Sequence, residues 1–248
     1  MREKEYGIWQ THSWSDMAKM VVHMAAGLHL AGLRRGEHMV VVGANRPRLT
    51  AAMLAAQTLG AIPVPLYQDA VASEYVFPIN NAEVRFAVVE NQEQVDKLLE
   101  IRPDCAGLAH IYFDDPRGLR NYQQTGLTSL TDLQQQGEQF AKQHPGFFDQ
   151  EVATNQADDV AAMFFTSGTT GNPKGVVHTH RSLLDRAKAG ADFDHLSENE
   201  EVLAYMPPAW IGQNIFSYAQ WLSCGYVVNC PESAATVNID LKEIGPTY

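Results

Sequence analysis

The 248-residue sequence predicts an α/β fold in which helices are layered on largely parallel sheets. Short apolar runs such as Met39–Val42 and Val84–Val89 have the composition of buried strands, and they alternate with stretches of helical period. Hydrophobic residues make up 45% and charged residues 19% of the chain, which is the balance of an ordinary globular protein with a sizeable core.

The first half of the chain supplies helices and strands in turn. Apolar residues recur at three- and four-residue steps from Ser13 to about Leu33, and Ser13 with Asp16 has the spacing of an N-terminal cap. Pro47 suits the first turn of a second helix, which ends at Gly60. The other elements predicted here are strands at Met39–Val42, Val84–Val89 and His110–Phe113, a helix at Gln92–Leu99, and an extended segment at Ile62–Pro65. The two prolines of this last segment place it at a sheet edge or at the start of a strand, not in the middle of a sheet.

The second half opens with a region of different character. Residues 114–159 contain few aliphatic runs, and we expect surface helix and loop there, with room for a domain boundary but no need of one. The alternation then returns, with strands predicted at Val160–Phe165, Gly175–His178, Val202–Tyr205 and Tyr226–Asn229, and helices at Arg181–Ala191 and Asn214–Leu222.

Charge and cysteine content exclude several classes of protein. The formal net charge of −11 opposes broad nucleic-acid binding, which needs a basic face, although a small phosphate pocket can still be locally positive. Cys105, Cys224 and Cys230 are odd in number and scattered, which argues against a disulfide framework and favours a cytoplasmic location. The sequence shows no apolar signal region and no apolar run of transmembrane length, so any membrane contact is expected to be peripheral.

The segment Thr166–Gly175, which reads TSGTTGNPKG, has the composition of an anion-binding loop. Its glycines let successive backbone N–H groups converge on an anion, its hydroxyls add donors, and Lys174 adds a positive charge suited to phosphate. The predicted phosphate-binding residues are Thr166, Ser167, Gly168, Thr169, Thr170, Gly171 and Lys174.

This loop differs from the common P-loop of nucleotide triphosphatases. Gly168 and Gly171 are too close together for that pattern, Pro173 precedes the lysine, and predicted strands border the loop on both sides. A flexible surface loop rich in glycine and threonine is the other interpretation, but such loops seldom carry so ordered a motif.

The ten residues resemble, without departure, the phosphate-loop motif of the acyl-adenylate-forming superfamily, which includes acyl-CoA synthetases, adenylation domains of peptide synthetases and firefly luciferase. The segments Gly60–Val64, Gln68–Val71, Asn91–Leu98 and Tyr205–Gln213 extend the likeness, most of them toward the long-chain fatty acyl-CoA synthetase branch. The resemblance covers nearly the whole chain. It implies that residues 1–248 form a partial N-terminal AMP-binding (adenylation) domain, with the C-terminal domain absent.

The resemblance implies a reaction in two steps. ATP activates the carboxylate of a fatty acid to acyl-AMP, and CoA then takes the acyl group to give acyl-CoA, so the expected small molecules are fatty acid, ATP and CoA, with Mg²⁺ as cofactor. Thr166 would be a Mg²⁺ ligand through its hydroxyl. No catalytic residue is identified here, because the family's Tyr-Gly-x-Thr-Glu segment, ribose-binding Asp and C-terminal lysine have no counterpart in this sequence.

Three further expectations stay open at the level of sequence. Trp210 stands where many relatives carry histidine, so the resemblance places Trp210 and Gly212 in the acyl pocket, against the alternative that Trp210 packs in the core. His178 and His180 would share one face of a strand, which makes metal binding imaginable, although polar histidines near the active face are favoured. The function itself has two alternatives: a non-catalytic remnant that binds phosphate or a partner, or an adenylating enzyme for an aryl or amino acid.

Overall fold

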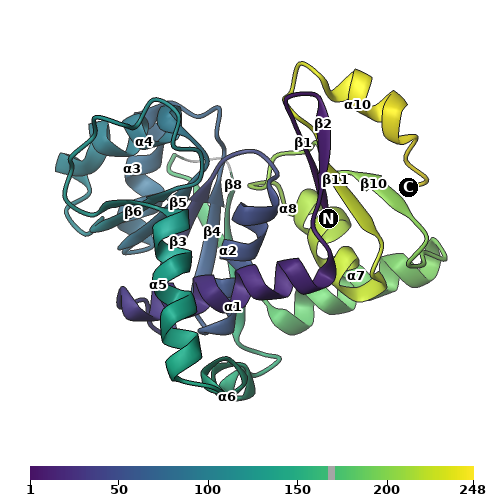
Figure 1. Cartoon of the computed structure of the whole chain (residues 1–248), viewed down its shortest axis with the longest axis horizontal. Helices are drawn as coiled ribbons and strands as arrows, with labels where there is room; N and C mark the ends of the chain where they lie inside the picture. Colours follow the sequence, from purple (N-terminus) through teal and green to yellow (C-terminus); the bar gives the residue numbers. More distant parts are fainter. Residues whose placement is uncertain (167–170) are drawn as a thin grey trace.

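A computed structural model describes residues 1–166 and 171–248, and within these ranges the strands form three sheets (Figure 1). The five-stranded sheet has the order β4-β3-β5-β6-β7, the four-stranded sheet the order β10-β11-β1-β2, and β8 pairs with β9 alone. The strands are β1 (Arg2–Glu5), β2 (Ile8–Thr11), β3 (His38–Val42), β4 (Ile62–Leu66), β5 (Phe86–Val89), β6 (His110–Phe113), β7 (Leu127–Ser129), β8 (Val160–Thr166), β9 (Lys174–Thr179), β10 (Glu201–Leu203) and β11 (Val227–Cys230).

Helices cover both faces of the five-stranded sheet. Those of the first half are α1 (Trp14–Leu30), α2 (Pro47–Thr58), α3 (Ala72–Asn81), α4 (Gln92–Ile101), a short 3₁₀ turn η1 (Arg102–Asp104), α5 (Leu130–Gln143) and α6 (Phe147–Thr154). The second half of the chain contains α7 (His180–Phe193), α8 (Ile211–Gln213), the π-helix η2 (Asn214–Ala219), α9 (Gln220–Cys224) and α10 (Val237–Ile244).

The predicted α/β class with largely parallel sheets is confirmed. Every pairing within the five-stranded sheet is parallel, as are those of β11 with β1 and with β10, whereas β1–β2 and β8–β9 are antiparallel. The proline-containing strand β4 lies at the edge of its sheet, as the two missing N–H donors require.

Side chains of β3 alternate between two cores. Met39 and Val41 pack with α1 and α2 in one hydrophobic cluster, whereas Val40 and Val42 pack with α3 and α4 in another. On the first face α1 and α5 approach closely, because Gly137 leaves no side chain where the backbone of His23 passes. These two cores hold the parallel sheet rigid beneath the loops that leave its strands.

Comparison with the predicted elements shows agreement in the strongly patterned segments. Ser13 Oγ accepts the N–H of Asp16 at 3.1 Å, so the predicted cap of α1 is confirmed. The strand predicted at Val202–Tyr205 ends at Leu203. Strands β1, β2 and β7 and helices α3 and α10 were not predicted. The β1–β2 turn uses left-handed Tyr6 and Gly7, a pair outside the usual Asn-Gly signal, and α3 contains Pro78, which is unusual inside a helix.

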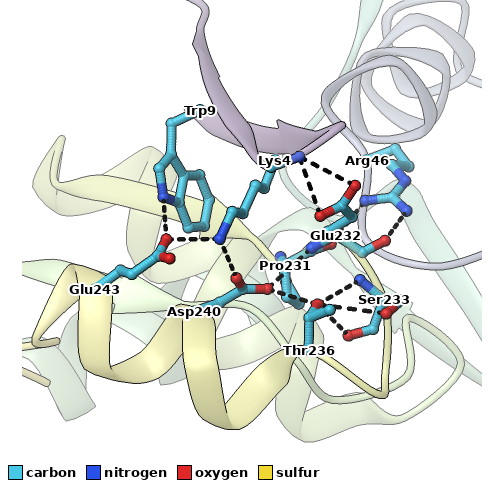
Figure 2. A network of polar contacts seen from close by, with 10 residues as sticks. Lys4, Trp9, Arg46, Pro231, Glu232, Ser233, Thr236, Asp240 and Glu243 are labelled. Carbon is cyan, nitrogen blue, oxygen red and sulfur yellow. Dashed lines mark hydrogen bonds and ion pairs between the residues drawn. The ribbon is translucent and has the colours of Figure 1, made fainter.

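A buried polar network joins the N-terminal hairpin to the last helix (Figure 2). Lys4 Nζ lies 2.8 Å from Asp240 Oδ1 and 2.6 Å from Glu243 Oε2, and Trp9 Nε1 donates to the same Glu243 oxygen. The Lys4 side chain is 6% exposed and that of Asp240 is fully buried. Asp240 also accepts the hydroxyl of Thr236 at 2.8 Å. Because a buried charge without a partner is costly, Lys4 and Asp240 depend on each other.

Two arginines near the start of α2 form ion pairs with carboxylates. Arg46 directly precedes this helix and Arg48 lies in its first turn, and their partners follow strands β5 and β6. Arg46 Nε lies 2.9 Å from Glu90 Oε1, and Arg48 Nε lies 2.8 Å from Asp114 Oδ1. Burial raises the pKa of Asp114 to about 6, and the nearby Arg48 guanidinium only partly opposes that rise. No helix in the described ranges combines the length and apolar composition needed to cross a bilayer.

The raised pKa of Asp114 makes folding stability depend on pH. Because the folded state holds the proton more tightly than the unfolded state, Asp114 contributes stability below its ordinary pKa, and this contribution is lost as the pH rises toward 6. We expect the free energy of unfolding, relative to that of Asp114→Asn, to fall by up to about 3 kcal/mol between pH 4 and pH 7. Urea titrations at each pH measure it. The exposed-site variant Asp185→Asn should show no such difference, and parallel pH profiles for wild type and Asp114→Asn would contradict the assignment.

Candidate phosphate-binding site

The predicted phosphate loop joins β8 to β9, which form a hairpin. The two strands pair in antiparallel register, with Phe165 opposite Gly175 and Thr166 opposite Lys174. Residues directly opposite in such a pair have Cα atoms about 5 Å apart. The pairing therefore places Thr166 and Lys174, the first and last residues of the predicted phosphate-binding set, side by side, and both are exposed.

The described part of the loop is consistent with an anion site. Gly171 has φ +129°, a backbone conformation that favours glycine, and a Cβ there would meet no atom of the described residues within 4 Å. Lys174 has no carboxylate within ion-pair distance among residues 1–166 and 171–248, so its charge stays available. Ser167, Gly168, Thr169 and Thr170, which were also predicted to contact phosphate, lie outside the described residues.

Packing on both faces of β8 holds the base of this loop in place. The ring of Phe165 meets Phe77 of α3 edge-on, with centroids 6.4 Å apart, and Met163 packs against the same core. On the other face Ala161, Ala162 and Phe164 form a smaller cluster with Leu183 of α7, and Ile211 of α8 packs against it. The strand that leads into the loop is therefore fixed between the main sheet and the helices of the second half.

A buried glutamine connects the three parts of the molecule that meet at β8. Gln57, in the last turn of α2, donates from Nε2 to the backbone oxygen of Ala161 at 2.8 Å. Its Oε1 accepts the hydroxyl of Tyr218, from the π-helix, at 2.6 Å. Asn155 Nδ2 in turn donates to the backbone oxygen of Gln57 at 3.2 Å. The single amide thus bridges α2, β8 and η2.

Sequence reasoning had no role for Gln57 beyond its place in a helix. The available signal is a long polar side chain in the otherwise mostly apolar stretch Leu54–Leu59, because a polar side chain on a buried helix face must find hydrogen-bond partners. Which partners it finds depends on tertiary structure, since Ala161 and Tyr218 lie more than a hundred residues away along the chain.

The predicted substrate-pocket residues Trp210 and Gly212 lie in direct contact. A Cβ at Gly212 would overlap the Trp210 ring, so the ring occupies the space that this glycine leaves. Trp210 is 39% exposed, which is inconsistent with the alternative of plain core packing. It directly precedes α8, whose Ile211 packs against the β8 cluster, so the Trp210 segment and the phosphate hairpin share one small core.

Two asparagines shape the segment that leads to Trp210. Asn45 Nδ2 donates to the backbone oxygens of Ala204 at 2.9 Å and Met206 at 2.7 Å. Asn214 Nδ2 donates to those of Pro208 at 2.6 Å and Trp210 at 3.0 Å. Asn214 is also the first residue of the π-helix η2. The hydroxyl of Tyr226, outside this helix, donates to the backbone oxygen of Phe216 within it. π-turns occur frequently at functional sites, and the sequence predicted only an ordinary helix here.

The histidine prediction is wrong in its geometry. His178 lies on β9, but His180 is the first residue of α7, so the two do not share a strand face. No group of three or more His, Cys, Asp or Glu in the described ranges is arranged to hold a metal ion. Cys105 and Cys230 are buried free thiols, as is typical of small apolar residues, whereas Cys224 is only partly buried. Burial raises the pKa of Cys230 to about 12, so it remains a thiol at neutral pH.

Comparison with known proteins gives a consistent match. The family model described as "AMP-binding enzyme" matches residues 3–248. Rat long-chain-fatty-acid–CoA ligase ACSBG2 is 26% identical over 247 residues, which is 97% of this chain and 36% of the rat protein. Fatty acyl-CoA synthetase A of Dictyostelium discoideum is 28% identical over 175 residues, covering 69% of this chain and 25% of its own. The chain thus spans between a quarter and about a third of these relatives.

Solved structures agree in fold. The N-terminal domain of FACL13 from Mycobacterium tuberculosis superposes with a TM-score of 0.76 at 19% identity, covering 97% of this chain and 55% of that one. A long-chain-fatty-acid–CoA ligase from Archaeoglobus fulgidus (FadD1) gives 0.78 at 19% identity, covering 99% of this chain and 46% of that one. At such identities the likeness establishes the shared fold and nothing about the substrate.

Replacing Gln57 tests whether it holds the parts of the site together. Gln57→Leu leaves the Tyr218 hydroxyl and the Ala161 carbonyl buried without their partner, so we expect the free energy of unfolding to fall by about 2–4 kcal/mol in urea titrations. Adding Tyr218→Phe should cost less in this background than in wild type, because it removes one orphaned group. Gln135→Leu, at an exposed position of α5, should stay within about 0.5 kcal/mol of wild type. An equally small effect of Gln57→Leu would show that the bridge does not matter.

Proposed function

Because the chain belongs to the AMP-binding enzyme family, we propose that Thr166–Gly175 holds the β- and γ-phosphates of ATP while a fatty acid is activated. The products are acyl-AMP and pyrophosphate, and CoA then displaces AMP to give acyl-CoA. The observation that carries this proposal is the register of β8 and β9, which sets Thr166 opposite Lys174 at the mouth of a glycine-containing loop.

The chemistry of adenylation explains why such a loop is needed. The carboxylate of the acid attacks the α-phosphate of ATP, so several negative charges gather in one place as pyrophosphate leaves. Donors that are already in position lower the energy of this arrangement without reorganising. Lys174 supplies a point charge that no carboxylate pairs with in the part of the chain that the structure describes, and the loop's backbone N–H groups and hydroxyls supply the remaining donors.

Thr166 is the residue of this chain that suits a magnesium ion. Its hydroxyl is exposed at the end of β8 beside the loop, and magnesium prefers hard oxygen ligands together with the phosphates of the substrate. When bound, Mg²⁺ neutralises charge on the phosphate oxygens. The chain's own contribution is to hold Thr166 and Lys174 across the hairpin, so that phosphate is oriented between them.

The fatty acid is favoured as substrate by the similarity to curated relatives, several of which are named long-chain-fatty-acid–CoA ligases. Trp210 supports this choice, because a half-exposed indole packed over Gly212 offers an apolar wall to an acyl chain. An acidic protein with three unpaired cysteines also fits a cytoplasmic enzyme that meets its substrate in solution or at a membrane surface.

Lys174 provides the most direct test of the phosphate loop. In the complete enzyme, Lys174→Ala should lower palmitate-dependent exchange of pyrophosphate into ATP by at least about a hundredfold, because a preorganised charge near the phosphates is lost. The matched variant Lys188→Ala removes an exposed lysine of α7 and should leave exchange unchanged. Near-normal exchange in Lys174→Ala would disprove the role of the loop. A wild type that supports exchange with aryl or amino acids but not with palmitate would disprove the fatty acid as substrate.

Trp210 tests the acyl pocket separately. Trp210→Ala removes the indole that covers Gly212, so we expect the profile of acyl-CoA formation across acids of increasing chain length to move while the KM for ATP stays within about twofold. Phe193→Ala, at an aromatic residue 83% exposed at the end of α7, is the control. An unchanged chain-length profile in Trp210→Ala would rule out a pocket role for this residue.

A further inference from the structure

A separate cavity of about 230 Å³ lies against the opposite end of β8. It is open to solvent on one side and is bordered by the last turn of α2, the end of α6, the first turns of α7 and the helix formed by η2 and α9. Ala161, its contact with β8, is about 17 Å along the strand from Thr166, where the phosphate loop begins. Trp210 and Gly212 do not line it. The cavity is therefore distinct from the proposed nucleotide and acyl sites.

The walls of this cavity are mostly aliphatic. The apolar residues that line it are Leu54, Val152, Ala161, Leu183, Leu184, Ala219 and Leu222. Three of them keep a large exposed fraction, with Val152 at 46%, Leu184 at 43% and Leu222 at 37%. An apolar lining that reaches solvent in this way favours entry of an apolar molecule over filling by water.

All but one of the polar side chains that line the cavity already make hydrogen bonds within the protein. Gln57 and Tyr218 bond each other, Asn155 donates to backbone oxygens of α2 and accepts from Arg35, and Thr58 donates to the Leu54 oxygen. The His180 ring has no hydrogen-bond partner within the described ranges. A ligand that enters here therefore meets one free polar group.

The state of His180 limits the chemistry of that ligand. Burial lowers the pKa of the ring below its ordinary value, with Asp159 only partly opposing the shift, so the imidazole is neutral at pH 7. A neutral imidazole offers one N–H donor and one nitrogen acceptor. It suits a hydroxyl or N–H group better than a carboxylate or phosphate, for which a cationic partner would be needed.

We propose that this cavity is a binding site for a small neutral molecule with one or two apolar rings and a single hydroxyl or N–H group, which pairs with His180. The volume is adequate, because a protein cavity of about 150 Å³ holds benzene and this one is larger. The site is independent of the proposed ligase reaction, since it shares no residue with the phosphate loop or with Trp210.

The test is a titration of the 248-residue chain with 2-naphthol, followed by the fluorescence of the naphthol. Saturable one-to-one binding is expected. His180→Phe keeps a ring but removes the hydrogen bond, so the Kd should rise about five- to tenfold. 2-Methylnaphthalene, which has no polar group, should bind wild type and His180→Phe equally. His178→Phe, on β9 and outside the cavity lining, is the matched control and should bind 2-naphthol like wild type.

A second variant keeps the result decisive if His180→Phe does not fold. Ala219→Leu places a larger side chain in the cavity, so it should abolish binding of both probes while circular dichroism remains that of wild type. Absence of saturable 2-naphthol binding in the wild type would overturn the proposal. So would an unchanged Kd in both His180→Phe and Ala219→Leu, which would indicate non-specific adsorption on exposed leucines. Neither result depends on ATP, palmitate or pyrophosphate exchange, so failure here leaves the proposed ligase function untouched.

Discussion

The buried amide of Gln57 is the interaction on which the arrangement of this molecule depends most. Its two ends join the phosphate hairpin, through Ala161, to the π-helix, through Tyr218, and its backbone belongs to the helix that packs on the parallel sheet. Buried hydrogen-bonding groups are costly when left without partners, so these three parts have little freedom to shift separately. The same amide forms part of the wall of the cavity beside His180.

The hairpin converts this rigidity into a chemical feature. Its first strand is packed on both faces, by Phe77 and the main core on one side and by Leu183 and Ile211 on the other. Its second strand is largely exposed and is held by pairing with the first. The loop between them thus begins from a firmly supported strand. Such support suits a site that works by holding donors in place rather than by supplying a nucleophile.

Charge networks give the N-terminal hairpin its place far from this site. Lys4 is surrounded by Asp240, Glu243 and Trp9, and Arg46 donates to the backbone oxygens of Pro231 and Glu232 (Figure 2). Arg46 also pairs with Glu90. The contacts of Lys4 with Asp240 and Glu243 join the two ends of the chain across more than two hundred residues. Buried pairs of this kind contribute to a unique arrangement more clearly than to net stability, because desolvation offsets much of their attraction.

The sequence by itself determined the fold class, most of the regular elements and the segment that we propose as the phosphate loop. Each of these depends on local pattern: the helical period and cap at Ser13, the β-branched runs of the main sheet, and ten consecutive residues from Thr166 to Gly175. The prediction that residues 1–248 form a partial N-terminal domain stays a prediction.

Tertiary structure alone decided the rest. The partners of Gln57 depend on segments far apart in the chain, and the position of His180 at the start of α7 depends on where a strand gives way to a helix. The hairpin at Tyr6 and the π-helix η2 carry no residue pattern that would predict them. The hairpin is stabilised by the pairing of β1 with β11, and η2 by the hydrogen bond from Tyr226, so tertiary contacts support conformations that local propensity does not favour.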